Sequence, residues 1–182
     1  MEDNKEYTIS EGKANLFSFL FFIPIFLITW VPYYFIWDLD FVINKNNIYN
    51  FLYGLIGCII AFIISIVLHE LIHGFVWSRF TKNGWKSIKI GIVWKSLLPF
   101  CHCYEPLKAY QYRLGLVMPT IILGIIPVIY SLITGSFDLL FYGFLMLLGG
   151  VGDIIVFFMM SKVKSDSIIK DHPSKMGFIV EN

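Results

Sequence analysis

The sequence has little charge for its length of 182 residues. Asp, Glu, Lys and Arg make up 15% of it, against about 25% in an average soluble domain. Hydrophobic residues make up 57%, above the roughly 45–50% of soluble proteins. A soluble fold of this size would have too few polar side chains to cover its surface. The composition therefore excludes an ordinary soluble domain and indicates an integral membrane protein surrounded by lipid.

The sequence also lacks an excess of either sign of charge. Lys and Arg number 14 and Asp and Glu number 13, so the net charge is +1. Such a chain has no strong positive field for attracting nucleic acid. We therefore expect no nucleic-acid partner.

Cysteine is scarce as well, with only Cys58, Cys101 and Cys103. An odd number of cysteines without the spacing of a secreted domain favours reduced thiols over a disulfide framework. A cleavable signal peptide is not expected either. The residues up to Lys13 are mixed and partly acidic, and the apolar run behind them is too long for a signal-peptide core.

Long apolar runs are abundant in place of charge. A helix that crosses the hydrocarbon core needs about 20 apolar residues. Four windows meet this length, at residues 16–37, 51–77, 114–134 and 137–160. Only Gly135 and Ser136 separate the last two windows, which predicts a tight helical hairpin. We therefore expect a single domain, residues 1–182, that is an all-α polytopic membrane protein with four transmembrane helices.

Positive charge is distributed unevenly between the predicted loops. All Lys and Arg residues except Lys45 fall in the tail 1–13, in the segment 79–113 or in the tail 161–182. Positive residues concentrate on the cytoplasmic side of membrane proteins. We therefore expect both termini and the central segment to face the cytoplasm.

The central segment, residues 82–113, has the pattern of β-structure. From residue 87 to 94, isoleucines alternate with other residues, as in a strand. Residues 99–104 form a second candidate strand, with 95–98 as the turn. We expect a short β-ribbon at the cytoplasmic membrane surface between the second and third helices.

The second window contains the motif His69-Glu70-Leu71-Ile72-His73. Residues four apart lie on one face of a helix, so the two imidazoles can bind a single metal ion. Glu70 is rotated from His69 by about 100°, which places it beside the metal rather than on it. From there a carboxylate can act as a general base on water. A chance occurrence of the motif is the alternative, but ionisable residues within a membrane are rare without a function.

A catalytic zinc site typically has three protein ligands. Away from the ends of the four windows, the only other ionisable residue is Asp153. His73 lies six residues before Arg79 and Asp153 nine before Lys162, so both lie on the order of 10 Å below the cytoplasmic surface at about 1.5 Å per residue. Asp153 is therefore the leading third ligand, although a lone Asp hydrogen-bonded within the bundle is an alternative. The rival ligands are His102, Glu105, Cys101 and Cys103.

Two further residues lie near the expected metal. Pro119, six residues into the third window, either frees a backbone carbonyl near the site or only kinks the helix. Ser65, one turn before His69, either supports that imidazole or bonds to its own helix backbone.

The sequence resembles a bacterial family of multi-span membrane proteins described as zincin peptidases, and more distantly the site-2 class of intramembrane metalloproteases. The resemblance is carried by four motifs: Leu68-His69-Glu70-Leu71-Ile72-His73-Gly74, Cys103-Tyr104-Glu105-Pro106-Leu107, Gly149 to Asp153, and Asp171 to Phe178. It implies an integral protein of the bacterial cell membrane. It also implies that His69, His73 and Asp153 bind Zn²⁺ and that Glu70 is the catalytic base.

These observations predict a zinc metallopeptidase that hydrolyses peptide bonds at or within the membrane near its cytoplasmic face. An extended segment of a peptide or membrane-protein substrate can pair with the ribbon from Ser87 to Tyr104. The alternatives are a non-catalytic metal-binding membrane protein, a scaffold or a small transporter. No internal repeat of the kind found in transporters is visible. Four helices enclose the site alone or as part of a homo-oligomer.

Overall fold

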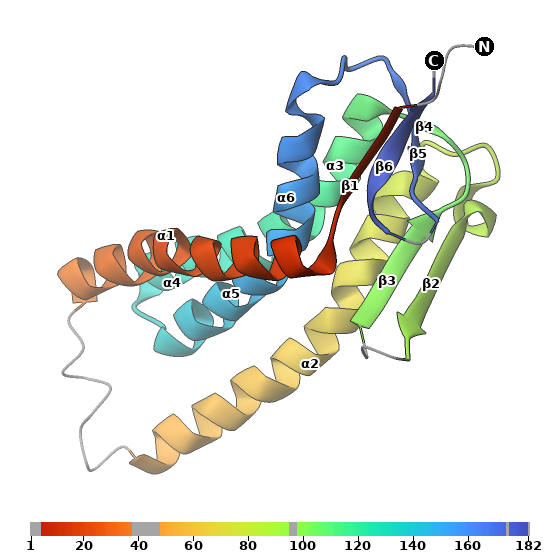
Figure 1. Cartoon of the computed structure of the whole chain (residues 1–182). Helices are drawn as coiled ribbons and strands as arrows, with labels where there is room; N and C mark the ends of the chain where they lie inside the picture. The colour runs from red at the N-terminus through yellow and green to blue at the C-terminus, as the bar shows by residue number, and fades with distance from the viewer. Residues whose placement is uncertain (1–4, 38–47, 95–97, 174, 182) are drawn as a thin grey trace.

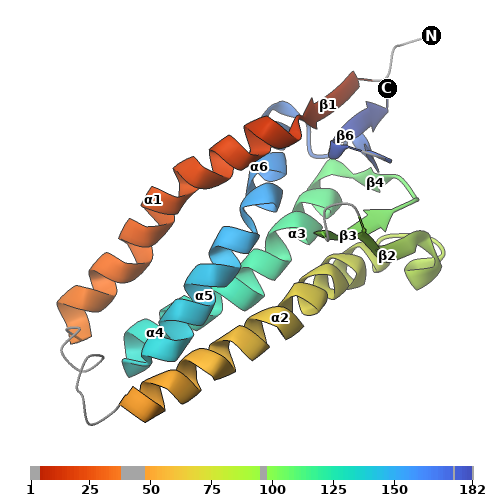
Figure 2. The same cartoon turned by 60° about the horizontal axis from the view of Figure 1, so that its bottom comes forward.

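The computed structural model describes residues 5–37, 48–94, 98–173 and 175–181. Two long helices lie on either side of a group of shorter ones, and β-structure covers one end of the bundle (Figures 1 and 2). The long helices are α1 (Glu11–Trp37) and α2 (Ile48–Ser78). The others are α3 (Ala109–Pro119), the π-helical segment η3 (Thr120–Ile125), α4 (Ile126–Thr134), α5 (Phe137–Gly149) and α6 (Val151–Met159).

Three helical stretches among the described residues are long and apolar enough to cross a membrane. They are Gly12–Trp37, Phe51–Ser78 and Ala109–Thr134. The predicted window 137–160 is not one helix, because Phe137–Gly149 and Val151–Lys162 meet at an angle of 45°. These two form a fourth candidate only if the bent pair is one span, so the count of four stays a prediction.

The surfaces of α1 and α2 are those of lipid-facing helices. Only 18% of the apolar window in α1 and 11% of that in α2 is buried within the protein. Phe19 and Phe35 on α1 are 73% and 80% exposed. Soluble proteins rarely expose a contiguous apolar surface of this extent to water. The fold therefore agrees with the predicted membrane protein.

The predicted helical hairpin is confirmed at the turn between α4 and α5. Gly135 ends α4 in the left-handed conformation with φ 72°, which glycine adopts without a steric penalty. The Ser136 hydroxyl accepts a hydrogen bond from the Leu139 amide and begins α5. The Tyr33 hydroxyl on α1 donates to the Gly135 carbonyl at 2.7 Å. The turn is thereby attached to the neighbouring helix.

The predicted β-ribbon forms as an antiparallel pair of β2 (Ile88–Val93) and β3 (Leu98–Cys103). A short 3-10 helix, η2 (Gly84–Ser87), precedes it. The hairpin lies along the second half of α2 (Figure 1), where a Cβ on Gly74 would lie 2.9 Å from side-chain atoms of Trp85 and Ile88. Glycine at position 74 therefore permits the close packing. Residues 95–97 of the predicted turn lie outside the described residues, and the position of the ribbon at the cytoplasmic surface stays a prediction.

The two tails form a sheet that corrects the all-α prediction. The order of this antiparallel sheet is β1 (Lys5–Ile9), β6 (Met176–Glu181), β5 (Ile168–Asp171) and β4 (Leu107–Lys108). Lys5 lies opposite Val180, so the first and last strands of the fold lie side by side (Figure 1). The strands have two to six residues and pair across most of the sequence. Such short strands are too brief for a reliable periodicity.

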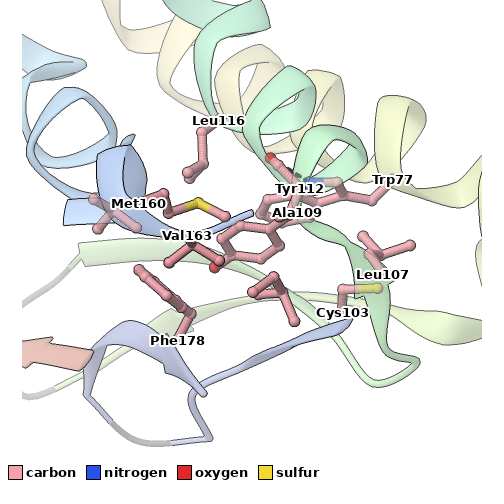
Figure 3. Packing of buried hydrophobic residues seen from close by; sticks show 11 residues of the cluster. Trp77, Cys103, Leu107, Ala109, Tyr112, Leu116, Met160, Val163 and Phe178 are labelled. Carbon is pink, nitrogen blue, oxygen red and sulfur yellow. Dashed lines mark hydrogen bonds between the residues drawn. The ribbon is translucent and has the colours of Figure 1, made fainter. Parts of the chain in front are cut away.

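A buried cluster joins this sheet to the helices (Figure 3). It contains Trp77 of α2, Tyr112 and Leu116 of α3, Met160 and, from β6, Phe178. A second cluster, around Phe144 and Leu147 of α5, packs the hairpin against α1. Trp77 of the first cluster follows His73 by one helical turn on α2. The β-sheet and the candidate site are thereby parts of one packed unit.

Candidate metal centre

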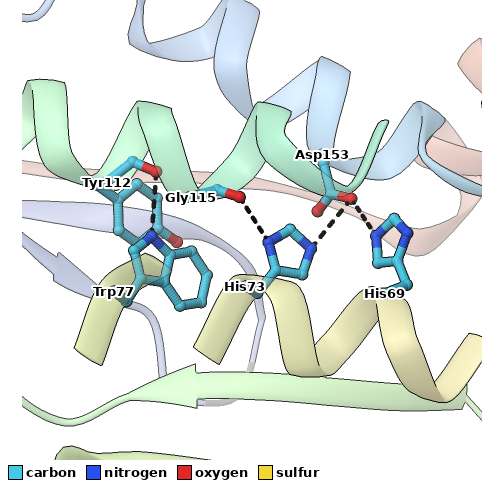
Figure 4. A network of polar contacts seen from close by, with 6 residues as sticks. All are labelled: His69, His73, Trp77, Tyr112, Gly115 and Asp153. Atoms are coloured by element: carbon cyan, nitrogen blue, oxygen red, sulfur yellow. Dashed lines mark hydrogen bonds and ion pairs between the residues drawn. The ribbon is translucent and has the colours of Figure 1, made fainter. Parts of the chain in front are cut away.

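Three predicted metal ligands come together between α2 and α6. The Nε2 atoms of His69 and His73 lie 2.8 Å and 3.3 Å from the same Oδ2 atom of Asp153 (Figure 4). One ligand atom from each residue lies within 4.8 Å of the other two. Both imidazoles are buried, with exposed fractions of 8% and 3%. The group can hold a metal ion, and its role as the ligand set stays a proposal.

Backbone contacts orient the ring of His73. Its Nδ1 atom lies 2.9 Å from the Gly115 carbonyl oxygen on α3. A carbonyl only accepts hydrogen bonds, so Nδ1 carries the proton and donates it. The lone pair of Nε2 then faces Asp153. A partner of this kind fixes the tautomer that a metal requires.

The Gly115 carbonyl is free for this contact because of Pro119. In an α-helix, the amide of residue 119 would donate to the carbonyl of residue 115. Proline has no N–H group, so His73 takes the place of the missing donor. Of the two roles predicted for Pro119, the freed carbonyl is the one that the structure supports.

Gly115 also makes room for an aromatic stack beside His73. A Cβ on residue 115 would overlap the indole of Trp77. The Trp77 ring lies between those of His73 and Tyr112, with centroid distances of 5.2 Å and 5.1 Å and interplanar angles of 18° and 9°. Glycine thus lets α3 approach α2 closely enough for the His73 contact with its backbone.

A break in the last helical pair places Asp153 in the first turn of a helix. α5 ends at Gly149 and α6 begins at Val151. A carboxylate is stabilised at a helix N-terminus, where backbone N–H groups lack helical partners. A Cβ on Gly150 would strike the Thr120 hydroxyl, so glycine at this position permits a close approach to η3.

Glu70 lies beside the group without belonging to it. It follows His69 on α2 and is half-buried, and its carboxylate interacts electrostatically with His73, His69 and Asp153. Within the described residues, this carboxylate makes no hydrogen bond or ion pair. The geometry leaves its oxygens able to accept a proton.

Two of the rival ligands have other partners. His102 on β3 bonds through Nδ1 to Asp171 at 2.9 Å. Glu105 accepts hydrogen bonds from the Ser87 hydroxyl and, at 2.8 Å, from the Lys82 amide. These bonds lower the pKa of the Glu105 carboxyl to about 2, so it is ionised and holds the loop before β2. Neither residue joins the metal group in the part of the chain that the structure describes.

The cysteines of β3 likewise stay outside the group. Burial raises the pKa of the Cys101 thiol and raises that of the Cys103 thiol to about 11. Neither thiol belongs to the group of His69, His73 and Asp153 that can hold a metal ion among the described residues. No second group with metal-ligand geometry occurs within the described ranges.

Sequence reasoning missed several residues that support the site. Ser65 fulfils neither predicted role, because its hydroxyl bonds to the Tyr142 hydroxyl at 2.7 Å. Trp77, Tyr112 and Gly115 were not predicted at all. For Gly115 a signal was present, since it lies four residues before a proline in a membrane helix.

The donor set suits zinc. Two imidazole nitrogens and one carboxylate oxygen are the protein ligands of several catalytic zinc sites, which leave a further coordination position open. The tautomer of His73 presents a free Nε2 lone pair to the group. The residues present therefore fit the metal that the predicted chemistry needs.

Two buried histidines of an HExxH helix that meet a carboxylate from a later helix have the arrangement of a zincin-type metal site in a helical, membrane-type fold. Residues 62–168 match the family described as "putative zincin peptidase", and the chain belongs to this family. Its membership supports a metallopeptidase and implies zinc as the metal. Searches of curated proteins and of solved structures give no match. The resemblance to site-2 proteases therefore remains a resemblance.

Replacing Pro119 by Ala is expected to weaken zinc binding severalfold. The new amide would compete with His73 for the Gly115 carbonyl, so the imidazole would be held less firmly. Equilibrium competition with a chromophoric chelator measures the effect. Pro127→Ala, at the start of α4, is the matched control and should bind zinc as the wild type does. Equal affinities for all three proteins would show that the freed carbonyl has no role.

Proposed function

We propose that this protein is a zinc-dependent membrane metallopeptidase that cleaves peptide bonds at or within the membrane, near its cytoplasmic face. The observation that carries the proposal is the meeting of His69, His73 and Asp153 with Glu70 beside them. Family membership supports the same kind of reaction. A non-catalytic metal site has no need of Glu70, so its presence favours an enzyme over a metal-binding scaffold or transporter.

In this proposal, the Nε2 atoms of His69 and His73 and the carboxylate of Asp153 hold the metal. Bound zinc supplies a Lewis acid for the scissile carbonyl. Glu70 accepts a proton from the attacking water at a carboxylate oxygen and delivers it to the leaving amine. Burial of both imidazoles limits the access of bulk water and strengthens each of these electrostatic contacts.

The β2–β3 ribbon is the proposed binding surface for the substrate. Peptide bonds within a helix are sheltered, so a scissile segment must be extended when it reaches the site. Each strand of this two-stranded sheet has one hydrogen-bonded neighbour, which leaves edges for an added strand. Cys101 of β3 lies against Gly74, one turn after Glu70. A substrate paired along the ribbon between Ser87 and Tyr104 would thus run close to the proposed base.

The cytoplasmic orientation rests on the distribution of Lys and Arg. The pairing of β1 with β6 supports a common side for the two tails, and their basic residues favour the cytoplasmic side of a bacterial membrane. Lys45 and Lys95 lie outside the described residues. With the site near the cytoplasmic face, the proposed substrate is a peptide or membrane protein that reaches it from the lipid or from the cytoplasm.

Removal of zinc is expected to abolish peptide cleavage by the purified protein in detergent, and its return should restore it. The assay uses a fluorogenic library of extended peptides, before and after dialysis against a chelator. Stoichiometric zinc is the test addition, and magnesium, a poor match for imidazole ligands, is the control. A protein that binds zinc but cleaves no member of the library would favour the non-catalytic alternative.

A further inference from the structure

The carboxylate of Asp171 joins three elements of the fold. It lies on β5, and its side chain is 13% exposed. Its Oδ1 atom accepts a hydrogen bond from the Tyr112 hydroxyl on α3 at 2.7 Å. Its Oδ2 atom pairs with His102 Nδ1 at 2.9 Å and accepts from the Cys103 amide at 3.2 Å. Both oxygens of a mostly buried carboxylate are thereby satisfied, as its stability in the interior requires.

Tyr112 connects Asp171 with the metal group. Its ring stacks on Trp77, which stacks in turn on the ligand His73 (Figure 4). The Trp77 Nε1 atom also donates to the Tyr112 carbonyl at 3.2 Å. Tyr112 and Trp77 are each 3% exposed, so neither ring can shift without disturbing the packed cluster around them.

A second contact runs through the backbone of α3. Gly115, whose carbonyl accepts from His73, follows Tyr112 by three residues and so lies on a neighbouring position of the same helical face. A hydrogen bond that fixes the position of Tyr112 therefore also fixes the rotation of α3 about its axis. Two features of His73, its stacked face and its Nδ1 partner, depend on the placement of this one helix.

We propose that Asp171 and Tyr112 are positioning residues for the metal site. Asp171 accepts the hydrogen bond of the Tyr112 hydroxyl and so fixes the position of Tyr112. Tyr112 in turn fixes the Trp77 ring and the placement of α3. Through these two, the His73 imidazole keeps the orientation that binds metal. The proposal rests on the zinc site of the proposed function. Asp171 lies beyond residues 62–168, which match the family, so in this proposal strand β5 of the carboxyl-terminal tail supports the metal centre.

Replacement of Tyr112 by Phe tests the proposal with little change of shape. The ring and its stack remain, and only the hydrogen bond to Asp171 is lost. We expect zinc affinity to fall about tenfold, within the range measured when a partner of a metal-binding histidine is removed. The measurements are zinc affinity, by competition with a chromophoric chelator in detergent, and the melting temperature of the metal-free protein.

Tyr33→Phe is the matched control. Tyr33 is 2% exposed, and its hydroxyl donates to a backbone carbonyl at 2.7 Å, at the turn between α4 and α5. Its loss should lower the melting temperature by a similar amount and leave zinc affinity unchanged. A merely structural role for Tyr112 predicts that the two variants behave alike in both measurements.

Asp171→Asn gives a second, independent variant that retains an acceptor oxygen. It should weaken zinc binding, and the double variant with Tyr112→Phe should bind zinc no more weakly than the weaker single variant, because both act through one contact. Wild-type zinc affinity in Tyr112→Phe would overturn the positioning role. Absence of zinc binding by the wild type itself would overturn the proposed function, which is a different result.

Discussion

Replacing Glu70 by Gln is expected to abolish peptide cleavage while zinc stays bound. Glutamine has nearly the same shape as glutamate but cannot accept a proton at neutral pH. General acid–base catalysis typically contributes 10²- to 10⁴-fold to a rate, so we expect kcat to fall about 1,000-fold. Glu70 lies beside the three proposed ligand side chains and is not among them. Its loss should therefore leave the affinity for zinc close to that of the wild type.

Two measurements on each protein separate the possible roles of Glu70. Cleavage of a peptide from the library reports catalysis, and elemental analysis reports bound zinc. Glu6→Gln, which alters an exposed carboxylate paired with His172 and Lys175, is the matched control and should retain full activity. Normal cleavage by Glu70→Gln would refute its role as the base. Loss of zinc from this variant would make Glu70 a ligand.

Removal of the Asp153 carboxylate is expected to have the largest effect on metal binding. In Asp153→Ala, His69 Nε2 and His73 Nε2 lose the oxygen that lies 2.8 Å and 3.3 Å from them. We expect zinc affinity to fall by more than about 100-fold, beyond the 10- to 100-fold that is typical for residues that only support a ligand. Two imidazoles alone do not complete a catalytic zinc site.

Asp138→Ala is the control for this prediction. Asp138 is another acidic residue of the bent helix pair α5–α6, in the first turn of α5, and it does not join the metal group. Its replacement should leave zinc affinity unchanged. Retention of zinc by Asp153→Ala, together with its loss from His102→Ala, would show that the third ligand is His102 on β3.

The membrane helices and the metal group were predictable from the sequence because each has a local signal. Hydrophobic runs of about 20 residues locate spanning helices, and the i, i+4 spacing of His69 and His73 places two imidazoles together. Counting residues to the basic ends of two windows predicts similar depths for His73 and Asp153, and the structure brings these two side chains together. Because ionisable residues are scarce within the apolar windows, few candidates for the third ligand had to be considered.

The remaining features depend on contacts between distant parts of the chain. The sheet that pairs Lys5 with Val180 has no periodic signal in its short strands. The break between α5 and α6 lies at Gly150, which packs closely against Thr120, and a hydropathy window does not detect such a contact. The contact of Asp171 with Tyr112 spans 59 residues, and no pattern in the sequence pairs these two residues. The contact between Asp171 and Tyr112 is also the one that connects the carboxyl-terminal tail with His73.

The zinc content of the purified protein tests the central claim most directly. Elemental analysis of the wild type, after incubation with zinc and removal of the excess, should give about one ion per chain, as expected for a single site. Asp153→Ala, treated in parallel, should give far less. A wild-type protein that retains no zinc, or an Asp153→Ala variant that retains as much as the wild type, would contradict a zinc centre built from His69, His73 and Asp153.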